Sequence, residues 1–214
     1  RTITILLVLI RIWSSCVAQS SIRNNLFNEL AVTKRDSLFN ELAVAKQDTN
    51  RVWLLYWLTG TYRFNQPDSA IYYGMKGLKL AREINFPAGE VAAMRFLAIS
   101  HISLGNYSKA MQIDLVAIRL AEENNLPSEK RILLAHLGDI YQNTGDYPEA
   151  MRYYKASVSL TDSAREYGWY IIILNDIGET YIKMEQIDSA KYYIKMAHKY
   201  SDIHKGGNDP FSLT

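Results

Sequence analysis

Apolar side chains recur at intervals of three and four residues along most of the chain from about residue 51 to residue 204. This spacing is typical of amphipathic helices. Glycine or asparagine breaks the pattern at regular points, and Pro87 and Pro127 are suited to the first turn of a following helix. The pattern therefore predicts an all-α chain built from pairs of antiparallel helices.

The helical pattern itself repeats every forty residues, as the alanines Ala70, Ala110, Ala150 and Ala190 show. A hairpin of two helices cannot bury its apolar side alone, so repeated hairpins stack on one another. We expect a right-handed α-solenoid of about four hairpins behind an N-terminal lead-in helix. The array covers residues 51–204, with units at about 51–86, 87–126, 127–166 and 167–204.

Small and large residues alternate within each unit in a way that suits close helix packing. A glycine or alanine of the first helix, such as Gly138, is expected to face the alanine of the second, here Ala150. A larger residue at either position should overpack the contact, at a cost of about 1–3 kcal/mol. The pairs Tyr153-Tyr154 and Tyr192-Tyr193 recur with the period, which favours packing over ligand stacking for these tyrosines.

The third unit contains Leu-Gly-x-x-Tyr followed by Gly-Asp-Tyr-x-x-Ala, within residues 137–150. These residues resemble the tetratricopeptide repeat, which usually has 34 residues. The resemblance implies a concave groove that is lined by the first helices and holds a protein or peptide partner. Carried over by position, the groove residues are Trp53, Tyr56, Trp57, Arg63, Arg95, Ile99, His136, Asp139, Gln142, Asn143, Asn175, Asp176 and Glu179.

The predicted groove runs from aromatic and basic side chains to polar and acidic ones. Aromatic and arginine side chains are common hot spots of interfaces. The alternative is that Trp53 and Trp57 pack on the lead-in helix instead. The family's carboxylate clamp of lysine and asparagine is not seen, which disfavours a chaperone-tail adaptor.

The first eighteen residues differ from the rest of the chain, with a basic start, an apolar core and small residues before Ala18. This is typical of a secretory signal peptide, and the run is too short for a membrane span. A buried N-terminal helix and a lipidated Cys16 are the alternatives. Residues 19–50 form a lead-in in which LFNELAVTKRDS is nearly repeated after twelve residues, and we expect it to be helical or partly ordered.

Composition and motifs argue against catalysis and against nucleic acid. The formal net charge is +2, so no basic surface is expected. No phosphate-binding loop, dinucleotide motif or His-Glu-x-x-His occurs. We expect no metal and no cofactor, a packed His101, and Asp139 and Glu179 unpaired on helix surfaces. The chain is therefore expected not to be an enzyme.

An export signal followed by forty-residue helical repeats also resembles the periplasmic sensor region of bacterial membrane histidine kinases. The resemblance implies the sensor or scaffold part of a larger two-component signalling protein, exported and periplasmic or membrane-associated. A free-standing exported scaffold or adaptor is the alternative. Membrane attachment would need a segment outside this chain. Residues 205–214 are expected to be a tail or the start of a further repeat, so that the natural chain continues.

Overall fold

The computed structural model describes residues 34–63, 65–163 and 165–204 of the chain. The chain divides into two compact units, residues 1–46 and residues 47–214. In the first unit, residues 34–44 form a helix. The proposed signal peptide, the first part of the twelve-residue duplication (residues 26–33) and the tail at 205–214 lie outside the described residues.

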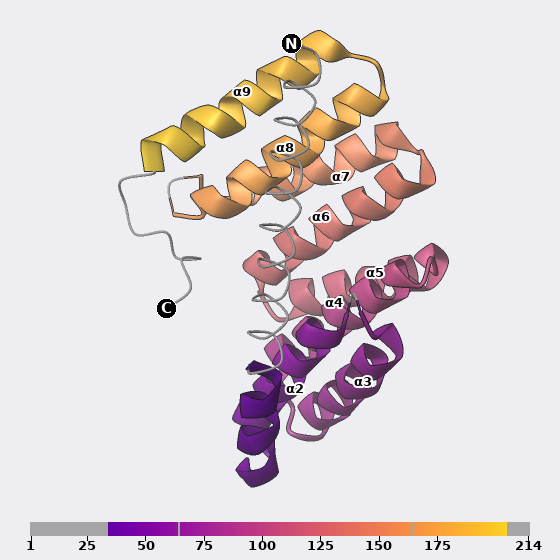
Figure 1. The fold of residues 1–214 in the computed structure, drawn as a ribbon, viewed down its shortest axis with the longest axis vertical. Helices are drawn as coiled ribbons and strands as arrows, with labels where there is room; N and C mark the ends of the chain where they lie inside the picture. The colour runs from indigo at the N-terminus through magenta and orange to yellow at the C-terminus, as the bar shows by residue number, and fades with distance from the viewer. Residues whose placement is uncertain (1–33, 64, 164, 205–214) are drawn as a thin grey trace, which may run out of the picture. The chain divides into compact units, whose positions relative to one another are not determined.

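The second unit is all-α and forms a solenoid of four consecutive helical hairpins, as the sequence predicts (Figure 1). The first helices of the hairpins are α2 (Thr49–Tyr62), α4 (Pro87–Ser103), α6 (Pro127–Thr144) and α8 (Tyr167–Lys183). The second helices are α3 (Pro67–Glu83), α5 (Tyr107–Glu123), α7 (Tyr147–Ser159) and α9 (Ile187–His204).

The four joints from α3 to α7 follow the forty-residue period in sequence and in backbone conformation. Asn85 and Asn125 both have φ of 52°, and Gly105 and Gly145 have φ of 73° and 87°. In this left-handed conformation the next amide reaches back to close the helix end, as Phe86 N does to the Ala81 carbonyl at 2.8 Å. Asparagine and glycine accept a positive φ at least cost, which explains their recurrence at these joints.

Successive hairpins contact one another more through their first helices than through their second ones. Helix α2 touches α4, α4 touches α6 and α6 touches α8, whereas no two consecutive second helices of the described array come within 8 Å of each other between Cα atoms. The hairpins therefore approach more closely along the side of α2, α4, α6 and α8. This side is the concave face of the array.

The contact between the two helices of the third hairpin at Gly138 differs from the prediction that Gly138 faces Ala150. A Cβ at Gly138 would lie 2.5 Å from Cε1 of Tyr154, so the glycine makes room for this ring, and its nearest neighbour is not Ala150. Tyr154 is fully buried and Tyr153 stacks on Tyr141 at 5.4 Å, which confirms the packing interpretation for both. The same interpretation is wrong for Tyr192, which is 59% exposed.

Within the part of the chain that the structure describes, no helix is both long enough and apolar enough to span a membrane.

Candidate functional site

The predicted groove residues all lie on the first helices or, for Arg63, at the residue that caps α2. Eight of them fall into two groups with different chemistry, and Phe96 of α4 packs with the first group. The aromatic–arginine group lies on α2 and α4 and contains Trp53, Tyr56, Trp57, Arg63, Arg95 and Phe96. The carboxylate group lies on α6 and α8 and contains Asp139, Asp176 and Glu179.

The aromatic–arginine group is a tightly packed cluster centred on Tyr56. Its ring stacks on Phe96 with centroids 4.4 Å apart, and its hydroxyl accepts a hydrogen bond of 2.6 Å from Arg95. Trp53 and Trp57 meet its ring edge to face, at 5.4 and 5.0 Å. Such pairs add about 0.5–1.5 kcal/mol each beyond the area they bury. The cluster is therefore a rigid shelf, on which Trp57 remains 48% exposed.

Arg63 and Arg95 place positive charge on this shelf. The guanidinium carbon of Arg63 lies 5.5 Å from the centre of the Phe96 ring, and that of Arg95 lies 5.2 Å from it. Arg95 also pairs with Glu129 on α6 at 3.6 Å. Arg63 donates to the Gly60 carbonyl at 2.7 Å. The two cations are thus held in place by aromatic faces and by neighbouring oxygens.

His136 is predicted to line the groove as an exposed residue, but the structure places it among the buried side chains. Burial, together with the positive charges of Arg95 and Arg63, lowers the pKa of His136 to about 3. The imidazole is therefore neutral at physiological pH, and its Nδ1 has no hydrogen-bond partner among the described residues. Ile99, one turn from Arg95 on α4, is partly buried.

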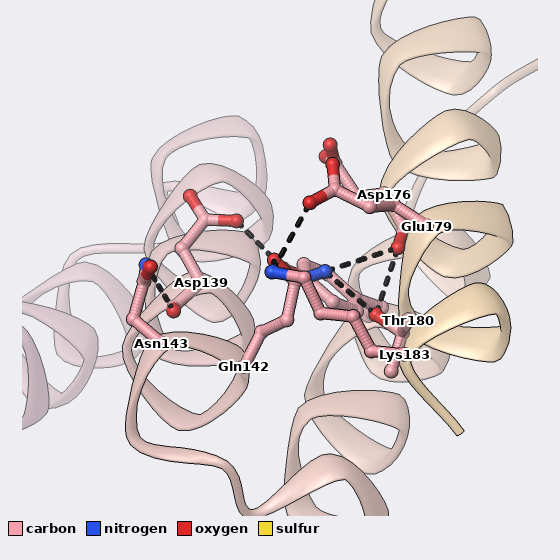
Figure 2. A network of polar contacts seen from close by, with 8 residues as sticks. Asp139, Gln142, Asn143, Asp176, Glu179, Thr180 and Lys183 are labelled. Atoms are coloured by element: carbon pink, nitrogen blue, oxygen red, sulfur yellow. Dashed lines mark hydrogen bonds and ion pairs between the residues drawn. The ribbon is translucent and has the colours of Figure 1, made fainter. Parts of the chain in front are cut away.

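The carboxylate group contradicts the expectation that Asp139 and Glu179 are unpaired surface residues. Figure 2 shows Asp139 on α6 opposite Asp176 and Glu179 on α8. Burial raises the pKa of Asp176 to about 7, and the negative charges of Asp139 and Glu179 also raise it. Burial likewise raises the pKa of Asp139 to about 6, although a hydrogen bond of 2.7 Å from the Tyr154 hydroxyl opposes the shift. These carboxylates repel one another across the face.

A polar network next to the carboxylates joins α6 to α8 (Figure 2). Gln142 Nε2 donates to Thr180 Oγ1 at 2.8 Å and to the Asp176 carbonyl at 3.3 Å. Lys183 Nζ donates to Gln142 Oε1 at 3.1 Å and pairs with Glu179, also at 3.1 Å. Gln142 therefore fixes the spacing of the two helices.

Five predicted groove residues belong to neither group: Ile99, His136 and Gln142, described above, and Asn143 and Asn175. Asn143 Nδ2 donates to the Asp139 carbonyl at 2.8 Å, within its own helix. Asn175 is exposed on α8. Both lie on the first helices, as the sequence predicts, but their side chains are not part of the shelf or of the carboxylate group.

The sequence prediction missed Asp114 on α5, which is fully buried. Neither of its carboxylate oxygens has a hydrogen-bond partner within the described residues. Burial raises the pKa of Asp114 well above its usual range, although the charge of Arg95 acts the other way. The sequence does contain a signal for a core position at Asp114, because the positions forty and eighty residues later hold the large side chains of Tyr154 and Ile194.

The three carboxylates do not form a metal centre. No group of three or more histidine, cysteine, aspartate or glutamate side chains that could hold a metal ion occurs among the described residues. Carboxylates that are spread over two helices suit an extended organic cation better, such as a lysine or arginine side chain.

Comparisons with known proteins agree with the fold. Residues 130–201, which lie in the third and fourth hairpins, match the family model for the tetratricopeptide repeat. No curated protein sequence matches the chain.

Three solved structures with the same fold are RapI without ligand, the Rap conjugation gene regulator of plasmid pLS20 with the Phr* peptide, and NprR with its cognate peptide NprX. Their TM-scores are 0.68, 0.74 and 0.66, at 14%, 12% and 23% identity. The matches cover 82%, 86% and 80% of this chain. The chain spans 64%, 51% and 50% of those proteins, and the likeness shows the fold alone.

Proposed function

We propose that the array is a non-catalytic module that binds a peptide, or an extended segment of another protein, along its concave face. A basic group of the ligand lies at Asp139, Asp176 and Glu179, and an apolar side chain lies on Trp57. The main support for this proposal is the separation of chemistry along the face. A rigid aromatic shelf lies at one end, and mutually repelling carboxylates lie at the other.

The carboxylates supply the energetic reason for a basic ligand. Asp176 is partly buried beside two other acids, and Lys183 is the cation that pairs with Glu179 in the described network. Burial and the neighbouring negative charges both disfavour the ionised form of Asp176, and raising the pKa of one carboxyl by one unit corresponds to about 1.4 kcal/mol of folding free energy. A cationic group of a ligand would relieve the repulsion, so part of this cost would return as binding free energy.

The neighbouring structures support the same type of ligand. The pLS20 Rap regulator and NprR were both solved with a bound peptide. A solenoid of stacked hairpins presents an extended concave surface, which suits an extended chain better than a compact small molecule.

We further propose that the module is the sensor or scaffold part of a larger signalling protein of the two-component type, exported through residues 1–18. A free-standing exported scaffold is the alternative. N-terminal sequencing of the protein from the native host tests the export step. A mature chain that begins at Gln19 is expected, and an unprocessed chain in the cytoplasmic fraction would contradict export.

Selection from a random peptide display library tests the binding function. We expect the enriched peptides to carry lysine or arginine at one end and an aromatic or aliphatic residue at a fixed distance from it. Asp176→Asn should weaken the selected peptides by about tenfold, since a buried charge pair contributes more than an exposed one. Glu123→Gln, at an exposed carboxylate of α5, is the matched control and should leave affinity unchanged. Enrichment without basic residues would contradict the proposal.

A further inference from the structure

A groove lies outside the concave face, between the second helices α3 and α5, and residues of α4 also line it. Its volume is about 420 Å³, within the range of about 300–1,000 Å³ that is usual for sites of small molecules. Seven of its eleven lining side chains are aliphatic or methionine, among them Leu78, Leu97 and Ile113. Met75 and Val116 on its walls are 53% and 48% exposed.

The groove exists because the second hairpin lacks a tyrosine pair that the later hairpins carry. In the third hairpin Tyr141 stacks on Tyr153 of α7 at 5.4 Å, and its hydroxyl reaches the Met111 sulfur of α5 at 3.8 Å. This pair spans the gap between α5 and α7. Tyr181 and Tyr193 stack in the same way at 5.4 Å. Forty residues before Tyr141 and Tyr153 stand the smaller His101 and Ile113, which leave the gap between α3 and α5 open.

Positive charge is also specific to this groove. Arg82 and Lys109 belong to its lining. The positions forty residues later hold Glu122 and Glu149, so these two cations are not repeated beside the tyrosine-filled gap between α5 and α7. Arg82 is oriented by Glu90 at 2.6 Å. Lys109 has no ion-pair partner in the described ranges.

We propose that this groove binds an apolar chain that ends in a carboxylate, in the manner of a fatty acid. The alkyl chain lies on Leu78, Leu97 and Ile113, where it covers apolar surface that is open to water. The carboxylate lies beside Lys109, with Arg82 at the same rim. The site is separate from the concave face and does not depend on the function proposed for that face.

The ligand class follows from the lining rather than from the size alone. Apolar side chains without a positive rim would suit any hydrocarbon, and a positive rim without an apolar floor would suit any anion. The apolar lining recurs forty residues later, but there Tyr141 and Tyr153 fill the space and Glu122 and Glu149 replace the two cations. An open apolar floor beside these two cations is therefore particular to the gap between α3 and α5.

Calorimetric titration of the full chain with dodecanoate, below its micelle concentration, tests the proposal. Dodecyltrimethylammonium serves as the control ligand, since it has the same alkyl chain and a positive head. We expect one saturable site for dodecanoate and none for the ammonium compound. Lys109→Glu, which reproduces Glu149, should weaken dodecanoate by about fivefold. Lys155→Glu, at an exposed lysine of α7, is the matched control and should have no effect.

The double variant His101→Tyr/Ile113→Tyr reproduces the tyrosine pair of the later hairpins and should fill the groove. We expect it to keep its circular dichroism spectrum and to bind dodecanoate at least about tenfold more weakly, because the alkyl chain loses its apolar floor.

Equal binding of both amphiphiles, unchanged affinity in Lys109→Glu, or no binding by the unmodified chain would overturn the proposal. A dimer that the filled variant dissociates, together with no dodecanoate binding, would assign the groove to a second copy of the chain. Faster proteolysis of residues 19–46 in the filled variant, again without dodecanoate binding, would assign it to the chain's own N-terminal part. Each of these two results would replace the fatty-acid assignment.

Discussion

Replacing Asp176 with asparagine should stabilise the ligand-free protein at neutral pH. The pKa of Asp176 is about 7 in the folded chain, against 3.8 for an unperturbed aspartate. Between these two values the folded state binds more protons than the unfolded state, so the free energy of unfolding falls as pH rises. An asparagine side chain cannot ionise, so the free energy of unfolding of the variant does not decrease with pH through this position.

The size of the effect follows from the difference between the two pKa values of Asp176. A difference of about three pKa units corresponds to a ceiling of about 4 kcal/mol. Part of the difference is shared with Asp139, because the two carboxylates titrate as a pair. We therefore expect a gain of about 1–3 kcal/mol at pH 8 and almost none at pH 4.

Urea unfolding followed by circular dichroism at about pH 4, 6 and 8 measures this gain. Glu123→Gln serves as the control, because substitutions at exposed surface positions usually change stability by less than about 0.5 kcal/mol. A destabilised Asp176→Asn at the highest pH, or a gain of the same size at the lowest and the highest pH, would refute the inference that burial and the neighbouring carboxylates disfavour the ionised form of Asp176.

Three further predictions concern the packing and the two ends of the face. Gly138→Ala should lower the free energy of unfolding in urea by about 1–2 kcal/mol, because overpacking against Tyr154 exceeds the gain of about 1 kcal/mol in helix propensity. Adding Tyr154→Leu to this variant should recover part of the loss, and additive effects of the two substitutions would be evidence against the contact. Tyr154→Phe should raise the pKa of Asp139 above about 6, because it removes a hydrogen bond to the carboxylate. A carbon-detected NMR titration measures this pKa, and the same pKa in both proteins would be evidence against the hydrogen bond. Trp57→Ala should weaken a selected peptide by about 1–2 kcal/mol in calorimetry without loss of helical content; undiminished affinity would remove the shelf from the site.

The helices and joints could be predicted from the sequence because they depend on local chemistry. Pro87 and Pro127 begin helices in the structure, as the sequence predicts. Among the described residues, five have positive φ, and four of these are asparagine or glycine at the joints from α3 to α7, whereas Glu185 takes this conformation before α9. Each of these choices is made within a few residues and then repeated every forty. Local signals of this kind can be recognised in the sequence without knowing how the helices pack.

The sequence places Asp139, Asp176 and Glu179 in the groove, but their proximity to one another could not be predicted in the same way. Asp139 and Asp176 are 37 residues apart, so they occupy different positions of the repeat. They lie opposite each other because of the relative shift of α6 and α8 along their axes. This shift is set by side-chain packing, which cannot be read from a single sequence. The burial of Asp114, in contrast, could have been inferred, because the repeat aligns Asp114 with the large side chains of Tyr154 and Ile194.

Photo-crosslinking of a selected peptide would show which face of the array holds the ligand and in which direction the ligand runs. The photoreactive residue p-benzoylphenylalanine would replace, one at a time, Trp57 and Glu179 on the concave face and Tyr72 and Tyr192 on the exposed second helices. We predict cross-links at positions 57 and 179, with the basic end of the peptide joined at 179, and none at 72 or 192. Cross-links at 72 or 192 instead, or a basic end joined at 57, would contradict binding along the concave face in this direction.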